Sequence, residues 1–337
     1  MRKTKKLLSA ALAGVMALSM TACGGTESNG SSASGSNSGE AGSYTVGICQ
    51  LQQHPALDAA TKGFRDKLDA LVQADGGKVT FEEQNASGDS ANCTPIINGF
   101  VSGGVDLIMA NATAALQAAQ AGTADIPILA TSITDYATAL DMDNWTGTTG
   151  VNISGTTDLA PLDGQADMLA EMFPDAKNVG LLYCTAEPNS AYQINTIKPM
   201  LEAKGYTCTE YAFTDSNDVA SVAQSAASSS DVIYIPTDNT AASCTETIAN
   251  VVIPAKIPVI AGEQGICEGC GVATLSIDYY ELGEMTGEMA YDILVNGKDP
   301  AEMEIQPAPN FTKMYNAANC EALGITPPEG YEAISAE

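Results

Sequence analysis

His54 is the only histidine in the chain, and Asp58 follows it by one helical turn. A histidine beside a carboxylate can act as a general base, but the sequence suggests no partner nucleophile. We therefore expect His54 to contact a ligand or the wall of a cleft. The alternative is a helix-entry residue that only forms local hydrogen bonds, since Pro55 is suited to the first position of a helix.

Cys267 and Cys270 form a C-x-x-C motif in a glycine-rich segment, which we interpret as a loop. Such a pair could carry out thiol redox chemistry or bind a metal, but a zinc site would need a second cysteine or histidine pair. The motif therefore predicts a local disulfide or two free thiols. A thiol-active enzyme remains the less favoured alternative.

Short polar side chains follow the apolar runs that we interpret as strands. In the first half these are Gln50, Asn111, Thr113, Ser132 and Thr134, and in the second half they are Glu187, Asn189, Ser190, Asp238, Asn239 and Glu263. Any one of them could be an ordinary helix cap or loop residue. As clusters at neighbouring strand ends, they could instead line a ligand site.

Two of these carboxylates, Glu187 and Asp238, are the leading candidates to pair with a bound cation, because a buried carboxylate is costly unless it is paired. The alternative is ordinary surface charge. Asp278, which precedes Tyr279 and Tyr280, either contacts the ligand or only fixes a hinge.

The elements that must position these residues alternate between strand and helix. The expected strands cover residues 44–49, 78–84, 106–110, 126–130, 178–183, 207–213, 232–235, 258–261 and 272–277. The expected helices cover residues 55–74, 91–102, 112–121, 163–173, 191–204, 219–228 and 242–253. This alternation predicts an α/β fold with parallel sheets covered on both faces.

The two halves of this pattern resemble each other on either side of a pause at residues 147–158. Val46-Gly47-Ile48 corresponds to Val179-Gly180-Leu181, and residues 126–130 (IPILA) correspond to residues 257–261 (IPVIA). A duplicated, doubly wound half predicts two lobes with a cleft between them, where a small molecule could bind by hinge closure.

The charge balance excludes several partners. The chain has 14 basic and 41 acidic residues, and its formal net charge is −27. Four basic residues precede Cys23 and all acidic residues follow it, so the chain from Cys23 onward carries a formal charge of −31. Arg65 is the only arginine after residue 2. Nucleic-acid binding is excluded, because it requires a basic surface.

The first 23 residues have the pattern of an export signal: a basic start, a short apolar run, and small residues that end at Cys23. Met20-Thr21-Ala22-Cys23 resembles the lipobox of bacterial lipoproteins, although leucine is usual at the position of Met20. We expect Cys23 to be lipidated and residues 24–43, rich in serine and glycine, to form a flexible tether. Plain secretion is the alternative.

Seven segments in one order resemble the substrate-binding lipoproteins of ABC importers, in the tryptophan/tyrosine-type group. They are VGICQLQQHPALDAATKGF (46–64), MANAT (109–113), TSITD (131–135), YCTAEPNSAYQ (183–193), YIPTDNTAAS (234–243), AGEQG (261–265) and ATLSIDYYELGEMTGEMA (273–290). The resemblance covers nearly the whole chain after the tether, but the cysteine pair 267/270 departs from it. It implies a type I periplasmic-binding-protein fold with three hinge crossings, no catalysis and no cofactor.

The resemblance also implies a free amino acid as ligand, with aromatic ones favoured, and delivery to a permease that a separate ATPase drives. Hydroxyls and helix amides of the first lobe would hold the carboxylate of the ligand. Asp238 or Glu187 would hold its ammonium group, and Leu57 and Ile133 would meet its side chain. The alternatives are another solute such as a nucleoside, or a receptor that senses its ligand.

The expected site therefore comprises fourteen ligand-binding residues and no catalytic or metal-binding ones: Gln50, His54, Leu57, Asn111, Thr113, Ser132, Thr134, Glu187, Asn189, Ser190, Asp238, Asn239, Glu263 and Asp278. We expect lobe 1 at residues 44–154 plus 281–305, lobe 2 at 155–280, and a hinge return with a C-terminal segment at 306–337. The protein is expected to be a monomer on the outer face of the cell membrane. Two disulfides are conceivable, Cys49 with Cys93 and Cys184 with Cys208.

Overall fold

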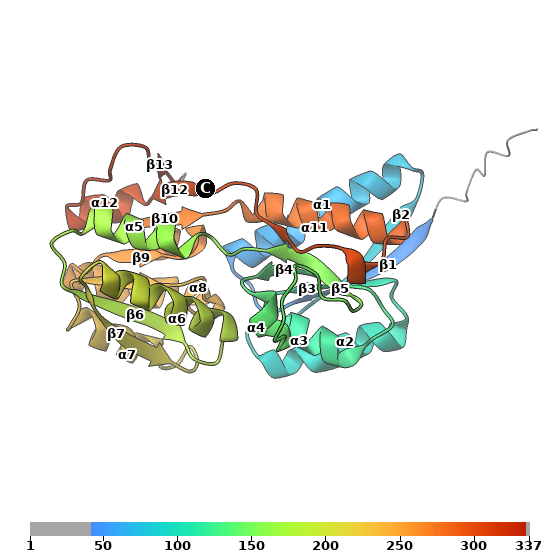
Figure 1. Ribbon diagram of the computed structural model, residues 1–337, viewed down its shortest axis with the longest axis horizontal. Helices are drawn as coiled ribbons and strands as arrows, with labels where there is room; N and C mark the ends of the chain where they lie inside the picture. Colours follow the sequence, from blue (N-terminus) through green and yellow to red (C-terminus); the bar gives the residue numbers. More distant parts are fainter. Residues whose placement is uncertain (1–41, 335–337) are drawn as a thin grey trace, which may run out of the picture. The chain divides into compact units, whose positions relative to one another are not determined.

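The computed structural model describes residues 42–334, which contain two β-sheets, each covered by helices on both faces (Figure 1). The export signal, Cys23 and the tether up to residue 41 lie outside the described residues, so the expectations about them stay predictions. Among the residues that are described, no helix is both long and apolar enough to cross a membrane.

The first sheet has six strands, and every neighbouring pair in it is parallel. Their order across the sheet is β11 (Gln306–Pro307), β5 (Ile153–Thr157), β4 (Ile128–Ile133), β3 (Leu107–Asn111), β1 (Ser43–Gln50) and β2 (Lys78–Asn85).

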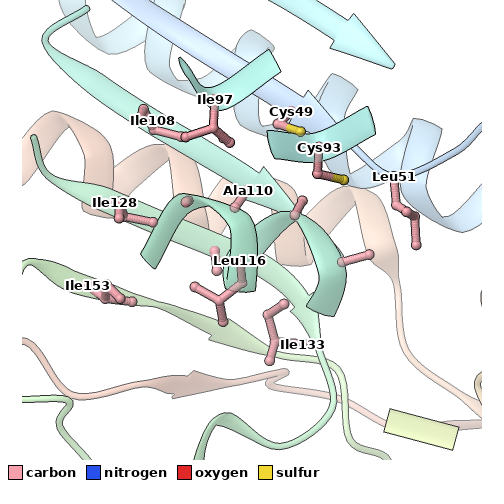
Figure 2. Packing of buried hydrophobic residues seen from close by; sticks show 14 of the residues in the cluster. Cys49, Leu51, Cys93, Ile97, Ile108, Ala110, Leu116, Ile128, Ile133 and Ile153 are labelled. Atoms are coloured by element: carbon pink, nitrogen blue, oxygen red, sulfur yellow. The ribbon is translucent and has the colours of Figure 1, made fainter. Parts of the chain in front are cut away.

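Side chains alternate between the two faces of this sheet, and each face packs on a different set of helices. Ile48 and Leu129 pack in a cluster with residues of α1 (Pro55–Ala74) and α11 (Tyr279–Leu294). Ile108 and Ile128 pack on the other side, with α2 (Ser90–Gly103), α3 (Thr113–Gly122) and α4 (Tyr136–Leu140); Figure 2 shows part of this cluster.

The second sheet has seven strands and is parallel except where β12 runs antiparallel to β10. Their order is β13 (Glu332–Ala333), β12 (Thr312–Tyr315), β10 (Ala273–Ser276), β9 (Val259–Ala261), β8 (Val232–Ile235), β6 (Asn178–Cys184) and β7 (Thr207–Phe213). One face packs on α5 (Leu162–Met172), α6 (Pro188–Ala203) and α12 (Ala317–Leu323). The other packs on α7 (Val219–Ala227), α8 (Asn239–Ser243), α9 (Thr245–Ala255) and α10 (Gln264–Gly269).

The chain passes between the sheets three times, after β5, between β10 and α11, and between β11 and β12. The expected boundary at residue 154 falls inside β5, and the one at residue 280 falls inside α11, which packs on the first sheet. The expected C-terminal segment is shared, because β11 joins the first sheet while β12, α12 and β13 join the second. The short helix η1 (Pro300–Glu302) precedes β11.

Helices α1 and α11 lie side by side over the first sheet (Figure 1), and glycines bring their backbones into contact. A Cβ atom on Gly63 would lie 2.1 Å from the carbonyl oxygen of Tyr280, and one on Gly283 would lie 2.1 Å from that of Ala60. Neither obstacle is a flexible side chain. The glycines therefore set the distance between the helix that carries His54 at its start and the helix that begins at the second crossing.

Replacing Gly63 or Gly283 with alanine is expected to lower the free energy of unfolding by about 1–3 kcal/mol, because the backbones must separate. Gly99→Ala is the matched control, since Gly99 is helical and a Cβ there meets nothing within 4 Å. The control should be neutral or raise stability by about 0.5–1 kcal/mol. Urea denaturation measures both. Equal stability of Gly63→Ala and Gly99→Ala would show that the helices are not held this closely.

Candidate functional site

A small space between the lobes brings together residues that follow strands in both sheets. It is lined by His54, Ala56, Leu57, Asp158, Thr237, Asp238, Asn239, Ala242, Glu263 and Tyr279. We call this set the inner site. Five of these residues, His54, Leu57, Asp238, Asn239 and Glu263, were predicted from the sequence as site residues.

Asn239 joins the two lobes at the inner site. Its Oδ1 lies 3.2 Å from His54 Nε2, and its carbonyl oxygen accepts a hydrogen bond from the Gln52 side-chain amide. Glu187 holds Asn239 from within the second lobe by accepting bonds from its backbone N–H at 3.0 Å and its Nδ2 at 2.7 Å. Burial lowers the pKa of His54, so the first lobe presents a neutral imidazole to this contact.

Asp238 and Glu263 each stand before a short helix and cap its first turn. Asp238 accepts hydrogen bonds from the backbone N–H of Ala241 at 2.8 Å and of Cys184 at 2.7 Å. Glu263 accepts bonds from the N–H groups of Gly265 and Ile266. The helix-cap interpretation and the site interpretation are therefore compatible here, since the caps fix carboxylates that also line the inner site.

Neither of these carboxylates has a cation. Burial, with a contribution from Glu187, raises the pKa of Asp238 to about 7, and burial is also the main cause that raises the pKa of Glu263 to about 7. None of the ion pairs within residues 42–334 includes either residue. A bound cation would remove the cost of burying them ionised.

Asp158 is a third buried carboxylate at the inner site, and the sequence analysis missed it. It accepts hydrogen bonds from Tyr279 Oη at 2.9 Å and from Thr134 Oγ1 at 3.2 Å. Burial raises its pKa to about 6, and its charge also raises the pKa of Glu263. The signal in the sequence was weak, because Asp158 directly follows β5, whose residues Ile-Ser-Gly-Thr-Thr do not form the apolar run of a typical buried strand.

Glu187 already has hydrogen-bond partners within the second lobe. Besides the bonds from Asn239, it accepts hydrogen bonds from the backbone N–H of Thr240 at 2.8 Å and from Thr240 Oγ1 at 2.7 Å. Asn189 Nδ2 adds a bond at 3.2 Å. Its main role in this structure is to anchor the start of α8, so of the two leading carboxylates only Asp238 lines the inner site.

The first lobe contributes polar atoms that have no partner. Within the described residues, the buried side-chain atoms without a hydrogen bond are His54 Nδ1, Asn111 Oδ1, Ser132 Oγ and Thr274 Oγ1. Three of the four belong to residues predicted as ligand contacts. Because buried polar atoms are nearly always satisfied, each of these three atoms is a candidate ligand contact, and of the three residues only His54 lines the inner site.

Backbone strain accompanies these atoms. Ala112, before α3, has φ 86° and ψ 158°, a conformation that is usual only for glycine, and Ser132 has φ 57°. Ala112 directly follows β3, and Ser132 is the penultimate residue of β4. Strain of this kind persists where the surrounding structure imposes it, and it clusters at ligand sites.

The other predicted residues differ in what they contact. Thr113 is buried in the first turn of α3, and Ser190 is buried and bonds to Asp238. Asn189 donates to the Thr237 carbonyl oxygen at 3.3 Å. Ile133 was expected at the ligand but is fully buried in the core of the first lobe.

Two residues that were predicted as ligand contacts form hydrogen bonds with other groups of the protein. The Gln50 amide donates to Asp58 Oδ1 at 2.6 Å and accepts from Thr61 Oγ1, all within the first lobe, and Gln50 is the last residue of β1 and not a loop residue. Asp278 is exposed and caps α11 through the N–H groups of Tyr280 and Glu281, which supports the hinge alternative.

A larger cavity of about 710 Å³ lies on the other side of the Asn239 contact. Its first-lobe wall includes Gln52, Ser87 and Gln117, and its second-lobe wall includes Glu187 and Asn189. We call it the outer cavity. The inner site, by contrast, has about 10 Å³ of free volume, which is about enough for one water molecule.

The cysteine motif was placed in the wrong kind of element. Cys267 lies in α10 and Cys270 at its end, and both are fully buried thiols. Burial raises the pKa of each, which disfavours the reactive thiolate that the enzyme alternative needs.

The disulfide that was conceivable between Cys184 and Cys208 is also wrong, because the β6–β7 register pairs Cys208 with Val179 and Cys184 with Phe213. Residues 42–334 contain no cluster of three or more potential metal ligands.

Comparison with known proteins agrees with this geometry. The family model for ABC transporter substrate-binding proteins matches residues 45–337. A tyrosine-binding protein of Clostridioides difficile is 34% identical over 328 residues, which cover 96% of this chain and 94% of that protein.

Two solved structures are similar throughout the body. A protein from Streptococcus pneumoniae in complex with L-Trp is 30% identical, with a TM-score of 0.80 over 86% of this chain and 100% of that one. The ligand-free, open structure of a substrate-binding protein with adhesive properties from Clostridium difficile is 35% identical, with a TM-score of 0.66 over 87% of this chain and 100% of that one. The two-lobed fold, the inner site lined by both lobes and these matches lead to one conclusion: the chain belongs to the family of ABC transporter substrate-binding proteins.

Proposed function

We propose that this protein captures a free amino acid, preferably an aromatic one, between its lobes and delivers it to the permease of an ABC importer. The observation that carries the proposal is the chemistry of the inner site. Three buried carboxylates, Asp158, Asp238 and Glu263, have no cationic partner, and His54, whose Nδ1 has no hydrogen bond, lines the same site from the first lobe. An α-amino acid has an ammonium group for these carboxylates and a carboxylate for hydrogen-bond donors of the first lobe.

The first lobe grips the ligand carboxylate without an arginine. The first N–H groups of α3 have no partner within the helix, and Ala112 has no side chain that could cap them. The Ser132 hydroxyl is an additional donor from the next strand end. Together they suit a carboxylate, because helix N-termini attract anions.

The second lobe and the first crossing grip the ammonium group. Asp238 and Glu263 come from the second sheet, whereas Asp158 directly follows β5 of the first sheet. A cation between them therefore contacts both lobes and favours their closure.

Ligand entry requires the lobes to separate. The inner site holds about 10 Å³ of free volume, far less than an amino acid occupies, and Gln52 and His54 close it against Asn239. The higher TM-score to the L-Trp complex than to the ligand-free, open structure supports the view that this arrangement resembles a closed state. The ligands of these relatives support an aromatic amino acid.

A calorimetric and thermal-shift screen of the twenty amino acids, with a nucleoside and a sugar as controls, tests the ligand class. Tyrosine or tryptophan should bind tightest. At a ligand concentration of 100 times Kd, the stabilisation should be about 2.7 kcal/mol. If a nucleoside or a sugar stabilises the protein while no amino acid does, the ligand class is wrong.

Removing the charge of Glu263 or Asp158 should weaken binding of the preferred amino acid by about tenfold or more, because each substitution removes a partner of the ammonium group. The variants are Glu263→Gln and Asp158→Asn, measured by isothermal titration calorimetry. Glu202→Gln is the matched control, since Glu202 is exposed on α6, and it should leave Kd unchanged.

The same variants give a pH test. Glu263 has a pKa of about 7 in the ligand-free protein, so binding an ammonium group below pH 7 must first remove a proton. The affinity of the wild type should therefore rise from pH 5 to pH 8, and Glu263→Gln should make that rise smaller, with Asp238 and Asp158 contributing the remainder. An analogue of the preferred amino acid that lacks the α-amino group should bind poorly to the wild type. Equal affinity for the analogue and the amino acid would refute the ammonium grip.

Delivery to a permease requires a protein held at the cell surface, and the N-terminal segment supplies the anchor in this proposal. The basic start, the apolar run and Met20-Thr21-Ala22-Cys23 support export with lipidation of Cys23. The acidic body by itself has little attraction for anionic lipid.

Cys23→Ser should release the protein from the membrane fraction into the medium and abolish its labelling by a radioactive fatty acid. Fractionation and labelling of cells that express the full chain measure both effects. Cys208→Ser, which changes a cysteine on the second lobe, is the control and should leave both unchanged. A membrane-bound, labelled Cys23→Ser protein would place the anchor elsewhere.

A further inference from the structure

Cys49 and Cys93 meet in the core of the first lobe. Cys49 is the penultimate residue of β1, and the alternation of side chains along that strand points it to the face that α2 and α3 cover, opposite to Ile48. Cys93 lies in the first turn of α2 and shares its buried stripe with Ile97 and Phe100. Figure 2 shows both sulfurs within the same cluster.

The two thiols are in contact and shielded from solvent. Each residue has no exposed surface, both are free thiols in this structure, and both belong to the same core cluster. This contact and burial raise the pKa of Cys49. A thiol in this position is inert once the lobe has folded, so any reaction of the pair must occur before the core closes.

The pair lies beneath two loops that form the first-lobe wall of the outer cavity. Cys49 is followed by the segment 50–54, and Cys93 is preceded by residues 86–90. Backbone hydrogen bonds join these loops, from Ala86 N–H to the Gln50 carbonyl oxygen and from Gly88 N–H to that of Leu51, both at 2.9 Å. A covalent link at the base of the loops would fix Gln52 and His54, which meet Asn239 of the other lobe.

We propose that Cys49 and Cys93 form a disulfide during folding, which links β1 to α2 beneath the wall of the outer cavity. This modification goes beyond the proposed ligand function and does not depend on which solute is bound. The oxidant is a disulfide of a thiol oxidase or of a small thiol such as glutathione. One thiolate attacks the oxidant and displaces one thiol, and the second thiolate displaces the other, so that two protein thiols become one disulfide and the oxidant becomes two thiols.

The test is to refold the reduced full chain with oxidised glutathione, then alkylate it under denaturing conditions and map its peptides without reduction. The expected product has lost two hydrogen atoms and contains Cys49 linked to Cys93. The same mapping on protein made by cells with its leader intact should give the same link if the chain is exported. The refolding experiment does not depend on whether the chain is exported.

Reduction of the linked protein should lower its Tm by roughly 5–10 °C, because the bond closes a long loop in the unfolded chain. The double variant Cys49→Ala/Cys93→Ala should show a lower Tm that no longer responds to reductant. Cys184→Ser/Cys208→Ser is the matched control, since the strand register keeps these residues apart, and it should stay sensitive to reductant. The peptide map of the wild type decides the matter if the double variant does not fold.

The proposal is overturned if Cys49 and Cys93 are both alkylated after oxidative refolding to a native circular-dichroism spectrum. It is also overturned if either cysteine is linked to a different one, or if reduction leaves the Tm of the wild type unchanged.

Discussion

The inner site depends on burying carboxylates that have no cation of their own. Asp238 and Glu263 remain in place because backbone N–H groups at the starts of α8 and α10 bind them, and Asp158 because Tyr279 and Thr134 do. These bonds orient the oxygens but do not neutralise them, as the raised pKa values indicate. A site of this kind is preorganised for a positively charged group, and the cost of burial is recovered only when that group binds.

The two sheets make this arrangement possible because parallel strands deliver successive polar residues to one edge. The first sheet places Asn111, Ser132 and Asp158 there, and the second places Glu187, Asp238 and Glu263. Three crossing segments of the chain connect the two sheets. The close packing of α1 on α11 fixes the start of α11, next to the second crossing, against the first lobe.

Much of the fold could be predicted from the sequence. The nine expected strands were all confirmed to within three residues, and α1 was confirmed at both ends, because buried strands and amphipathic helices leave periodic patterns that depend only on neighbouring residues. β5, β11, β12 and β13 were missed. The last three are two to four residues long, and in β5 serine, glycine and two threonines follow a single apolar residue, Ile153, so none has a strong local pattern.

By itself, the sequence determined the fold class, the duplication and the set of polar residues at the strand ends, because each of these depends on local order along the chain. The tertiary structure alone decided what each polar side chain binds. Gln50 turns to Asp58 and Thr61, Glu187 to Asn239 and Thr240, and Asp158 to a tyrosine 121 residues further along. The same local signal, a carboxylate or amide after a strand, therefore produced a contact within one lobe, a helix anchor and a buried carboxylate at the inner site, because the outcome depends on groups that only folding brings near.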